Sequence, residues 1–220
     1  MKAMILAAGR GERLRPLTDE TPKPLLKVAG KSLIEYHLQN LVDAGFKDII
    51  INTAWLAEKI HQRLGDGERY GASITYSDEG TALETAGGII NALPLLGKEP
   101  FLVVNGDIWC DFDFSTLTEL APNTQSHLIL VNNPEHNPDG DFALRDNLVK
   151  NAGDIKYTFS GIGIYRAEFF AEQPSGALPL APIIRSKCEE DLVSGQFYDG
   201  QWTDAGTIER LQELDQKLTE

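Results

Sequence analysis

The chain has 220 residues, of which 42% are hydrophobic and 24% are charged, and its formal net charge is −13 at pH 7. This composition is typical of a globular protein, and no apolar run is long enough to cross a bilayer, which argues against a membrane partner. The acidic charge argues against a nucleic-acid partner, because a phosphate backbone would be repelled. The N-terminus lacks the long apolar stretch of a secretory signal, so we expect a cytoplasmic protein.

Charge is unevenly distributed along the chain. Residues 1–31 carry seven basic and three acidic side chains, a net charge of +4, which leaves −17 on the other residues. A compact basic segment that contains glycines, on an otherwise acidic chain, favours a pocket for a small polyanion over a surface for a polymer. The two cysteines, Cys110 and Cys188, are far apart and form no metal-binding motif.

Strand and helix patterns alternate through the first half. A short apolar run at 3–8 predicts a buried strand that ends at Gly9. Ser32 and Glu35 form a capping box before a helical pattern, and Gly45 marks the end of that helix. The further elements predicted here are strands at 48–52, 73–76 and 101–104, and helices at 54–64 and from about residue 85. This alternation is typical of parallel strands with helical crossovers.

After residue 107 the pattern changes. Strands are predicted at 127–131, 141–146, 148–151 and 157–165, and closing helices at 179–189 and 207–218. The short polar turns between these strands favour antiparallel pairing. We therefore predict an α/β fold, a Rossmann-like three-layer sandwich with a mainly parallel mixed sheet and antiparallel additions in the second half. Residues 1–220 are expected to form a single domain.

The densest motif is the segment at 6–26, LAAGRGERLRPLTDETPKPLL. Gly9 and Gly11 follow the first predicted strand, where missing side chains let backbone N–H groups approach phosphate oxygens. Two familiar phosphate-binding motifs are excluded. A dinucleotide fingerprint needs glycine where Leu14 stands, and a Walker A loop needs glycine where Leu25 stands.

This segment resembles the signature of the sugar-1-phosphate nucleotidyltransferase family, G-x-G-x-R-L-x-P-L-T followed by P-K-P-L. Two later stretches agree in order and spacing, namely NGD at 105–107 after a strand and WTDAGT at 202–207 before the last helix. The resemblance spans essentially the whole chain. It implies transfer of a nucleotidyl group from a nucleoside triphosphate to a sugar 1-phosphate, with the nucleotide bound by about residues 1–110 and the sugar phosphate by about 111–220.

The resemblance assigns catalytic roles to Arg13 and Lys23, whose charges would balance those that grow on the phosphates in the transition state. It assigns Mg²⁺ to Asp107 and Asp204, because two carboxylates with phosphate oxygens and water suit this hard, octahedral ion. Each aspartate alone could be a turn or helix-capping residue. The glycines and cations of the signature segment favour the metal role.

The stretch SDEGTALETAGGI at 77–89 corresponds to the base-reading segment of the family. The nucleotide-binding residues implied by the resemblance are Ala8, Gly9, Gly11, Glu79, Gly80 and Thr85. Asn105 and Gly161 are assigned to the sugar phosphate. Many relatives carry a Glu-Lys-Pro element whose lysine contacts the sugar phosphate, and this chain has none. Lys156 and Arg185 are the candidates to replace that lysine.

Within the family, the short length and phrases such as INTAWLAEKI and WTDAGT favour a uridylyltransferase that uses UTP. Two alternatives stay open at this point. One is a guanylyltransferase acting on mannose or heptose 1-phosphate, and the other is a non-catalytic, nucleotide-binding regulatory domain. Retention of both phosphate cations and both metal carboxylates argues against the regulatory domain. We expect a monomer or a small homo-oligomer.

Overall fold

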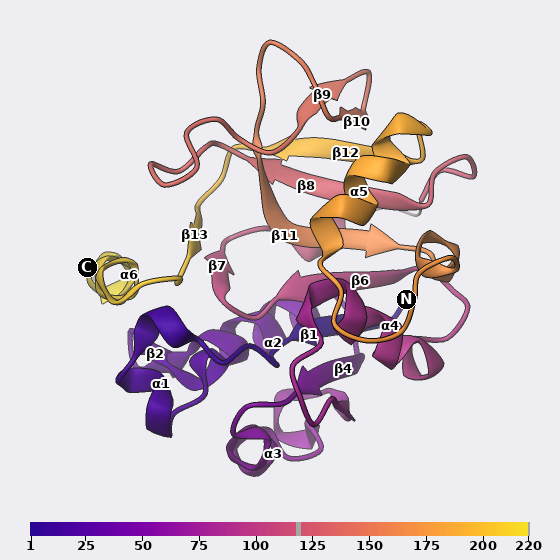
Figure 1. Cartoon of the computed structure of the whole chain (residues 1–220). Coiled ribbons are helices and arrows are strands. Elements are labelled where there is room, and N and C mark those ends of the chain that lie inside the picture. The colour runs from indigo at the N-terminus through magenta and orange to yellow at the C-terminus, as the bar shows by residue number, and fades with distance from the viewer. Residues whose placement is uncertain (118–119, 220) are drawn as a thin grey trace.

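The computed structural model describes residues 1–117 and 120–219. Within them, nine strands form one mixed sheet in the order β5-β4-β1-β6-β11-β8-β12-β10-β9, which runs through the middle of the molecule (Figure 1). The first half of the chain contributes four neighbouring parallel strands, β1 (Ala3–Leu6), β4 (Asp48–Thr53), β5 (Ser73–Asp78) and β6 (Phe101–Asn105).

The second half of the chain extends this sheet from β6. Its strands are β8 (Ser126–Val131), β9 (Ala143–Arg145), β10 (Leu148–Lys150), β11 (Thr158–Tyr165) and β12 (Val193–Tyr198). β11 is antiparallel to both β6 and β8, whereas β12 is parallel to β8. β9 and β10 form a hairpin at the far edge, turned by Asp146 and Asn147, which both have positive φ.

Helices cover both faces of the sheet and give the molecule three layers (Figure 1). The four principal helices are α2 (Leu33–Asp43) and α3 (Ala57–Leu64) on one face, and α4 (Glu84–Leu96) and α5 (Leu180–Glu189) on the other. Side chains of β1 alternate between the two cores, because Ala3 and Ile5 pack toward α2 and α3 while Met4 packs toward α4 and α5. The predicted three-layer α/β sandwich with a mixed sheet is confirmed.

The start of α2 follows the predicted capping box. The backbone N–H of Ser32 donates to the Glu35 carboxylate at 3.2 Å, and the Ser32 hydroxyl donates to it at 2.5 Å. Arg63 and Tyr70 donate to the same carboxylate at 2.9 and 2.7 Å. Burial alone would raise the pKa of Glu35, but these hydrogen bonds lower it to about 2. The charged Glu35 therefore ties α2 to α3 and to the turn that precedes β5.

Smaller elements lie at one end of the sheet. They are α1 (Leu17–Glu20), the hairpin β2 (Lys27–Val28) and β3 (Lys31–Ser32), the ladder β7 (Ile108–Cys110) and β13 (Trp202–Asp204), and α6 (Ile208–Thr219). Leu211 and Leu214 of α6 share a third buried cluster with Leu14 and Val28. The C-terminal helix therefore packs on the segment that contains the signature motif.

The β7–β13 ladder joins two distant parts of the chain. It places Asp204 opposite Ile108, and the backbone N–H of Ala205 donates to the carbonyl of Asp107 at 2.8 Å. Asp107 and Asp204 thus lie side by side at the backbone level, as expected if both follow strands at one edge. No helix of the described residues is long and apolar enough to cross a membrane.

Five strands of the structure, β2, β3, β7, β12 and β13, have no counterpart among the predicted elements. β12 lies inside the sheet, between β8 and β10, although its sequence VSGQFY has neither a continuous apolar run nor a clean alternation. Its Gly195 lies so close to the neighbouring strands that a Cβ would stand 2.7 Å from Val149 Cγ2. A glycine inside a strand usually weakens it. Here the missing side chain allows β12 to fit between its neighbouring strands.

Candidate active site

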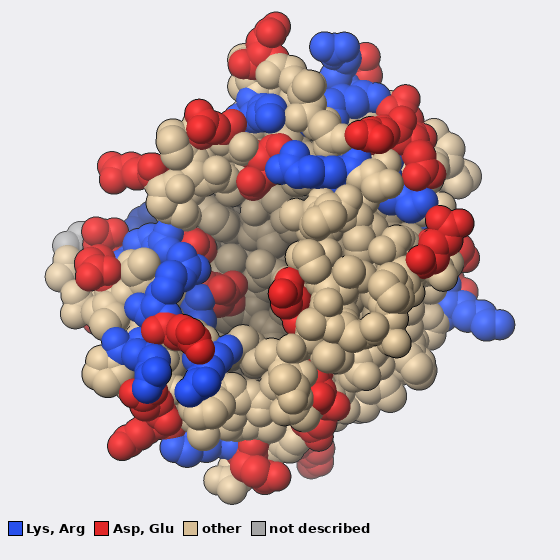
Figure 2. Space-filling view, viewed as in Figure 1, with Lys and Arg blue, Asp and Glu red and all other residues tan. Residues whose placement is uncertain are grey.

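A pocket of about 190 Å³ opens at the carboxyl ends of the parallel strands, where open α/β sheets bind their ligands. Its lining residues are Leu6, Ala7, Ala8, Gly9, Lys23, Pro24, Asn52, Ala82, Glu84, Thr85, Asn105 and Asp107. Figure 2 shows this face hollowed at its centre, with Lys and Arg side chains gathered beside the hollow where Figure 1 shows α1, β2 and α6. The basic segment and the pocket predicted from the sequence therefore adjoin.

The loop after β1 folds tightly because Gly11 adopts a left-handed conformation with φ +67°. A Cβ at Gly11 would lie 2.9 Å from Thr18 Cγ2 and 3.2 Å from Lys23 Cβ, so another residue would push the loop off Lys23. The Thr18 hydroxyl donates to the Gly11 carbonyl at 2.8 Å. Of the predicted nucleotide-binding residues, Ala8 and Gly9 line the pocket, and Gly11 shapes the loop behind them.

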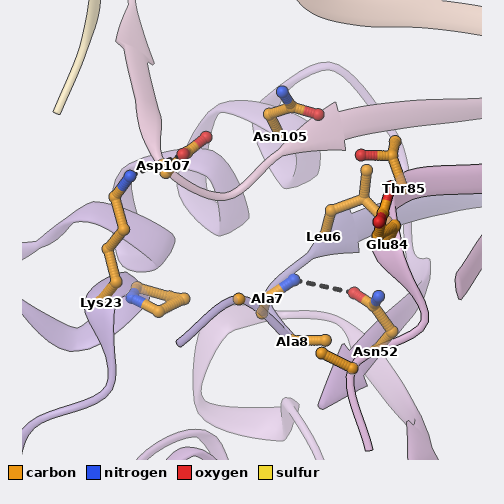
Figure 3. Close-up of a pocket in the computed structure, with 12 residues that line it drawn as sticks. Leu6, Ala7, Ala8, Lys23, Asn52, Glu84, Thr85, Asn105 and Asp107 are labelled. Atoms are coloured by element: carbon orange, nitrogen blue, oxygen red, sulfur yellow. Dashed lines mark hydrogen bonds and ion pairs between the residues drawn. The ribbon is translucent and has the colours of Figure 1, made fainter. Parts of the chain in front are cut away.

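Lys23 reaches across the pocket to Asp107, as Figure 3 shows. Its Nζ donates to Asp107 Oδ2 at 2.6 Å, and the lysine is 7% exposed while the aspartate side chain is 41% exposed. Gly106 lets this turn pass over β1, because a Cβ there would stand 2.5 Å from the Leu6 carbonyl oxygen. The ammonium group is thus fixed at the pocket with one predicted metal carboxylate as its partner.

His37 of α2 supports the strand that follows Asp107. Its Nε2 lies 2.8 Å from the Ile108 carbonyl oxygen and donates to it, since a carbonyl can only accept. Burial lowers the pKa of His37 to about 4, so the imidazole is neutral at pH 7. This buried side chain thus supports the backbone at Ile108.

Asp204 stands in a mixed charge environment. Its Oδ1 lies 2.9 Å from Arg210 Nη1 and its Oδ2 lies 3.4 Å from His136 Nε2. The predicted phosphate cation Arg13 lines a neighbouring cavity of about 560 Å³ together with Asp204 and Arg210. Arg13 and Lys23 thus flank the two aspartates, Lys23 from the pocket and Arg13 from this cavity.

One observation, on an oxygen of Asp204, indicates that the two aspartates could bind a divalent metal. Asp204 Oδ1 is buried, and although Arg210 is near, no hydrogen bond to this oxygen is formed by the described residues. A buried carboxylate oxygen that lies near a cation but accepts no hydrogen bond keeps unused acceptor capacity, which suits a metal ion. Within the described residues no cluster of three or more His, Cys, Asp or Glu side chains could hold a metal alone. Phosphate oxygens and water would therefore complete the ligand set, as magnesium prefers.

The side of the pocket predicted to bind the base is held by a chain of hydrogen bonds. The Ala7 N–H donates to Asn52 Oδ1 at 2.8 Å (Figure 3), and Asn52 Nδ2 donates to Glu79 at 2.6 Å. Glu79 also accepts the N–H of Leu83 at 2.8 Å. Glu79 thus lies behind the pocket wall, where it positions Asn52. Two further residues, Gly80 and Thr85, were predicted to bind the nucleotide. Thr85 lines the pocket, whereas Gly80, with φ +67°, is an exposed turn residue.

A second cavity of about 300 Å³ continues the pocket, because both are lined by Glu84, Thr85 and Asn105. The other lining residues of this cavity are Asp141, Phe142, Phe159, Pro179, Leu180, Ala181, Ile184 and Arg185. The Arg185 guanidinium lies 5.0 Å from the centre of the Phe142 ring, a cation–π distance. The lining thus combines apolar side chains with two carboxylates, Glu84 and Asp141, and one cation, Arg185.

Two of the residues predicted to bind the sugar phosphate touch each other. Gly161 has φ +83° in an irregular part of β11, and a Cβ there would lie 2.6 Å from Asn105 Nδ2. The glycine therefore sets the position of the Asn105 amide at the junction of the two cavities. Arg185 lines the second cavity, but Lys156 lines neither. The structure favours Arg185 over Lys156 as the cation of this region.

A family model described as "Nucleotidyl transferase" matches residues 2–142, which include the signature segment, Lys23 and Asp107. The chain belongs to the nucleotidyl transferase family. One relative, the N-acetylmuramate alpha-1-phosphate uridylyltransferase of Neisseria meningitidis serogroup B, is 56% identical over 97% of this chain and 96% of its own length. A protein of the same name from Caulobacter vibrioides is 34% identical over 99% and 97%.

A solved structure shares the fold of this nucleotidyl transferase. It is a Bacillus anthracis protein, assigned as a glucose-1-phosphate thymidylyltransferase and crystallised with sucrose, with a TM-score of 0.85 and 24% identity. The match covers 100% of this chain and 96% of that one. The similarity extends through the antiparallel half of the sheet, beyond the residues that the family model matches.

Several residues that line this site are absent from the sequence-based assignment, among them Asn52, Glu84 and Arg210. Asn52 is the penultimate residue of β4 and lines the pocket, and the rule that strand ends meet at one edge could have pointed to it. Glu84 opens α4 with φ +58°, a strained backbone that no sequence pattern announces. Arg210 follows the WTDAGT stretch within one helical turn, and its spacing from Asp204 was the available signal.

Proposed function

We propose that this chain is a cytoplasmic uridylyltransferase that transfers UMP from UTP to N-acetylmuramate α-1-phosphate, forming UDP-N-acetylmuramate and pyrophosphate in peptidoglycan recycling. The 56% identity over nearly the full length of the Neisseria relative supports the substrate pair. One geometric observation supports the reaction type. The buried Lys23 meets Asp107 at 2.6 Å where the β7–β13 ladder sets Asp204 alongside, so that one ammonium group and two carboxylates share the strand edge.

In the proposed reaction, an oxygen of the sugar phosphate attacks the α-phosphorus of UTP. The bond from this phosphorus to the oxygen bridging the β-phosphate breaks, and pyrophosphate leaves. Lys23 would contact the α-phosphate and the sugar phosphate, and Arg13 the β- and γ-phosphates, so that both balance the growing charge. Asp107 and Asp204 would hold Mg²⁺, which when bound neutralises phosphate oxygens and orients them for in-line displacement.

The described part of the site offers cations and carboxylates but no Ser–His or Cys–His pair. Burial raises the pKa of Cys110 to about 12, which removes this thiol as a nucleophile near pH 7. A covalent nucleotidyl-enzyme is therefore not expected, and a single displacement should invert the configuration at an α-phosphorothioate centre. Retention of configuration would overturn this mechanism.

The second cavity suits the proposed sugar. N-acetylmuramate carries a lactyl ether that ends in a carboxylate, which N-acetylglucosamine lacks, so a selective pocket needs a cation near that end. Arg185 supplies a guanidinium at the wall of this cavity, against the Phe142 ring. A guanidinium can meet a carboxylate with two parallel hydrogen bonds, whereas an ammonium is a point charge.

Turnover assays test the proposal directly. The enzyme would be given UTP, GTP, CTP, ATP and dTTP, each with the 1-phosphates of N-acetylmuramate, N-acetylglucosamine, mannose and heptose. We expect the highest kcat/KM with UTP and N-acetylmuramate α-1-phosphate. Preference for GTP with mannose or heptose 1-phosphate would establish the guanylyltransferase instead, and nucleotide binding without turnover would indicate the regulatory domain.

A further inference from the structure

Arg210 occupies an unusual position at the start of α6. It is the third residue of that helix, and its guanidinium turns back over the helix start toward Asp204, where Nη1 lies 2.9 Å from Oδ1. The arginine side chain is only 16% exposed. Gly206 makes room for it, because a Cβ at Gly206 would lie 2.3 Å from Arg210 Nη2. The glycine of the WTDAGT stretch is therefore explained by the arginine that packs on it.

The contact between these two charges is close but is not locked by hydrogen bonds. Asp204 Oδ1 and Arg210 Nε are both buried, and neither forms a hydrogen bond with the described residues. Charge proximity holds the pair, while part of the hydrogen-bonding capacity of each partner stays unused. The cavity of about 560 Å³ beside them, which Arg13 and Thr207 also line, offers the guanidinium space to turn. Such a pair can exchange partners when stronger ones arrive.

The other aspartate also has a cation beside it, although that pair is hydrogen-bonded. Asp107 pairs with Lys23 at 2.6 Å, and Asp204 pairs with Arg210 at 2.9 Å, so each carboxylate already has its own cation. A divalent ion that enters alone must displace two basic side chains that then lose their partners, and this cost lowers its affinity. A triphosphate changes the balance, because its oxygens coordinate the ion and also accept the released guanidinium and ammonium groups.

We infer that Arg210 is a positioning residue that holds Asp204 until the triphosphate arrives, so that the enzyme takes up its divalent metal together with the nucleotide and not before it. Arg210 thereby couples metal binding to nucleotide binding. The inference rests on the proposed function in one respect, the role of Asp204 as a metal carboxylate. It does not depend on which base or sugar the enzyme uses.

The coupling is measured by binding, without turnover. Mn²⁺ is titrated into the full-length protein and free Mn²⁺ is followed by electron paramagnetic resonance, first alone and then with a saturating non-hydrolysable UTP analogue, corrected for Mn²⁺ bound by the free analogue. The ratio of the two dissociation constants gives the coupling. In the unmodified enzyme we expect weak binding of Mn²⁺ alone and a large ratio.

Two variants remove the restraint in different ways. Arg210→Gln deletes the cation, and Gly206→Ala displaces the guanidinium while keeping it in the protein, although its Cβ would also lie 3.2 Å from Asp204 Oδ2. Both should bind Mn²⁺ alone more tightly and lower the coupling ratio, by about tenfold for Arg210→Gln. Arg210→Lys should keep most of the coupling. Lys217→Gln removes the same charge from the exposed far end of α6 and should change neither constant.

Several outcomes would overturn the inference. If Arg210→Gln tightened Mn²⁺ binding equally with and without the analogue, the arginine would only add to the general field. If it left Mn²⁺ binding unchanged, Arg210 would not compete for Asp204. Asp204→Asn separates this failure from that of the metal site itself. It should weaken Mn²⁺ binding in the presence of the analogue and should abolish the gain when combined with Arg210→Gln, and if it does neither, Asp204 is not a metal ligand.

Discussion

The two ends of the connected cavities are built in different ways. At the nucleotide end, the pocket residues follow the parallel strands β1, β4 and β6 directly, and Lys23 is 7% exposed. At the sugar end, the walls come from β11, α5 and the segment before β9, and Arg185 is an exposed residue on a helix. A buried, fixed cation suits the chemistry of phosphoryl transfer, whereas an accessible cation in a cavity of mixed polarity suits discrimination between sugars.

This difference predicts that changes at the two ends alter different kinetic constants. Side chains that act on the reacting phosphates contribute chiefly in the transition state, so their loss should lower kcat. Side chains that contact a distant part of the sugar contribute equally in the bound substrate and the transition state, so their loss should raise KM. Asn105 stands at the junction of the two cavities and links both ends.

The largest effect is expected at the nucleotide end. Asp107→Asn and Asp204→Asn should each lower kcat by about 10²–10³-fold, because each removes a ligand charge from the metal site. Steady-state rates at saturating substrates and magnesium measure this, and thermal melting checks that the fold is intact.

The two substitutions should not be additive, since either one disables the same ion. The double variant is expected to be little slower than the slower single variant. A single variant with near-wild-type turnover at limiting magnesium would show that the carboxylates do not share one site.

At the sugar end, Arg185→Ala should raise KM for N-acetylmuramate 1-phosphate. The expected loss of binding free energy is about 1.5–3 kcal/mol, the range of a hydrogen bond to a charged group. KM for N-acetylglucosamine 1-phosphate should change little, because this sugar has no lactyl carboxylate. Both constants are measured at saturating UTP, and kcat should stay nearly constant.

Arg145→Ala is the matched control, because this exposed arginine on β9 lines neither cavity. It should leave both KM values unchanged. If Arg185→Ala raised the two KM values by the same factor, the arginine would be a general phosphate contact and the two ends would not be divided as proposed.

The sequence allowed the nucleotide end to be predicted far better than the sugar end, for physical reasons. Parallel strands between helices have strong local signals, and the loop after each strand stays close to its neighbours along one edge. β1, β4, β5 and β6 were therefore predicted almost at their bounds, and four of the predicted site residues, Ala8, Gly9, Lys23 and Asp107, line one pocket of the structure.

The sugar end depends on contacts between residues far apart in the chain. β12 pairs with β8 some 67 residues earlier, as Val193 with Ser126 shows, and its glycine-containing sequence has no local strand signal. The lysine expected from relatives was missing, and the choice of Arg185 over Lys156 came from the structure, in which Arg185 lines the second cavity and Lys156 does not. Local periodicity cannot supply such information.

A smaller effect is expected from the glycine between the two ends. Gly161→Ala must place a Cβ where the Asn105 amide lies, at 2.6 Å, and must adopt φ +83°. We expect KM for the sugar 1-phosphate to rise by about threefold to tenfold through displacement of Asn105, with a stability loss of about 1–3 kcal/mol. KM for UTP should change less.

Gly97→Ala separates strain from displacement. Gly97 has φ +90° after α4, and no atom of the described residues lies within 4 Å of its Cβ position. It should lose similar stability without changing either KM. Equal kinetic effects in the two variants would mean that backbone strain alone, and not the contact with Asn105, explains the result.

The smallest effect on activity is expected from the scaffold of the nucleotide end. Glu35 ties α2 to Arg63 and Tyr70, and its pKa is lowered to about 2 from an ordinary value of 4.5. A lowered pKa contributes stability that is present above about pH 4.5 and is lost as the pH falls toward 2. Glu35→Gln should therefore cost about 1–2 kcal/mol of unfolding free energy at pH 7, with the difference from the unmodified protein shrinking across that window.

Denaturant unfolding from pH 7 down to pH 2 measures the difference, and kcat at pH 7 should be unchanged because the carboxylate contacts none of the site residues. A difference that stayed constant down to pH 2 would show that packing of the side chain, and not its charge, stabilises this half of the molecule.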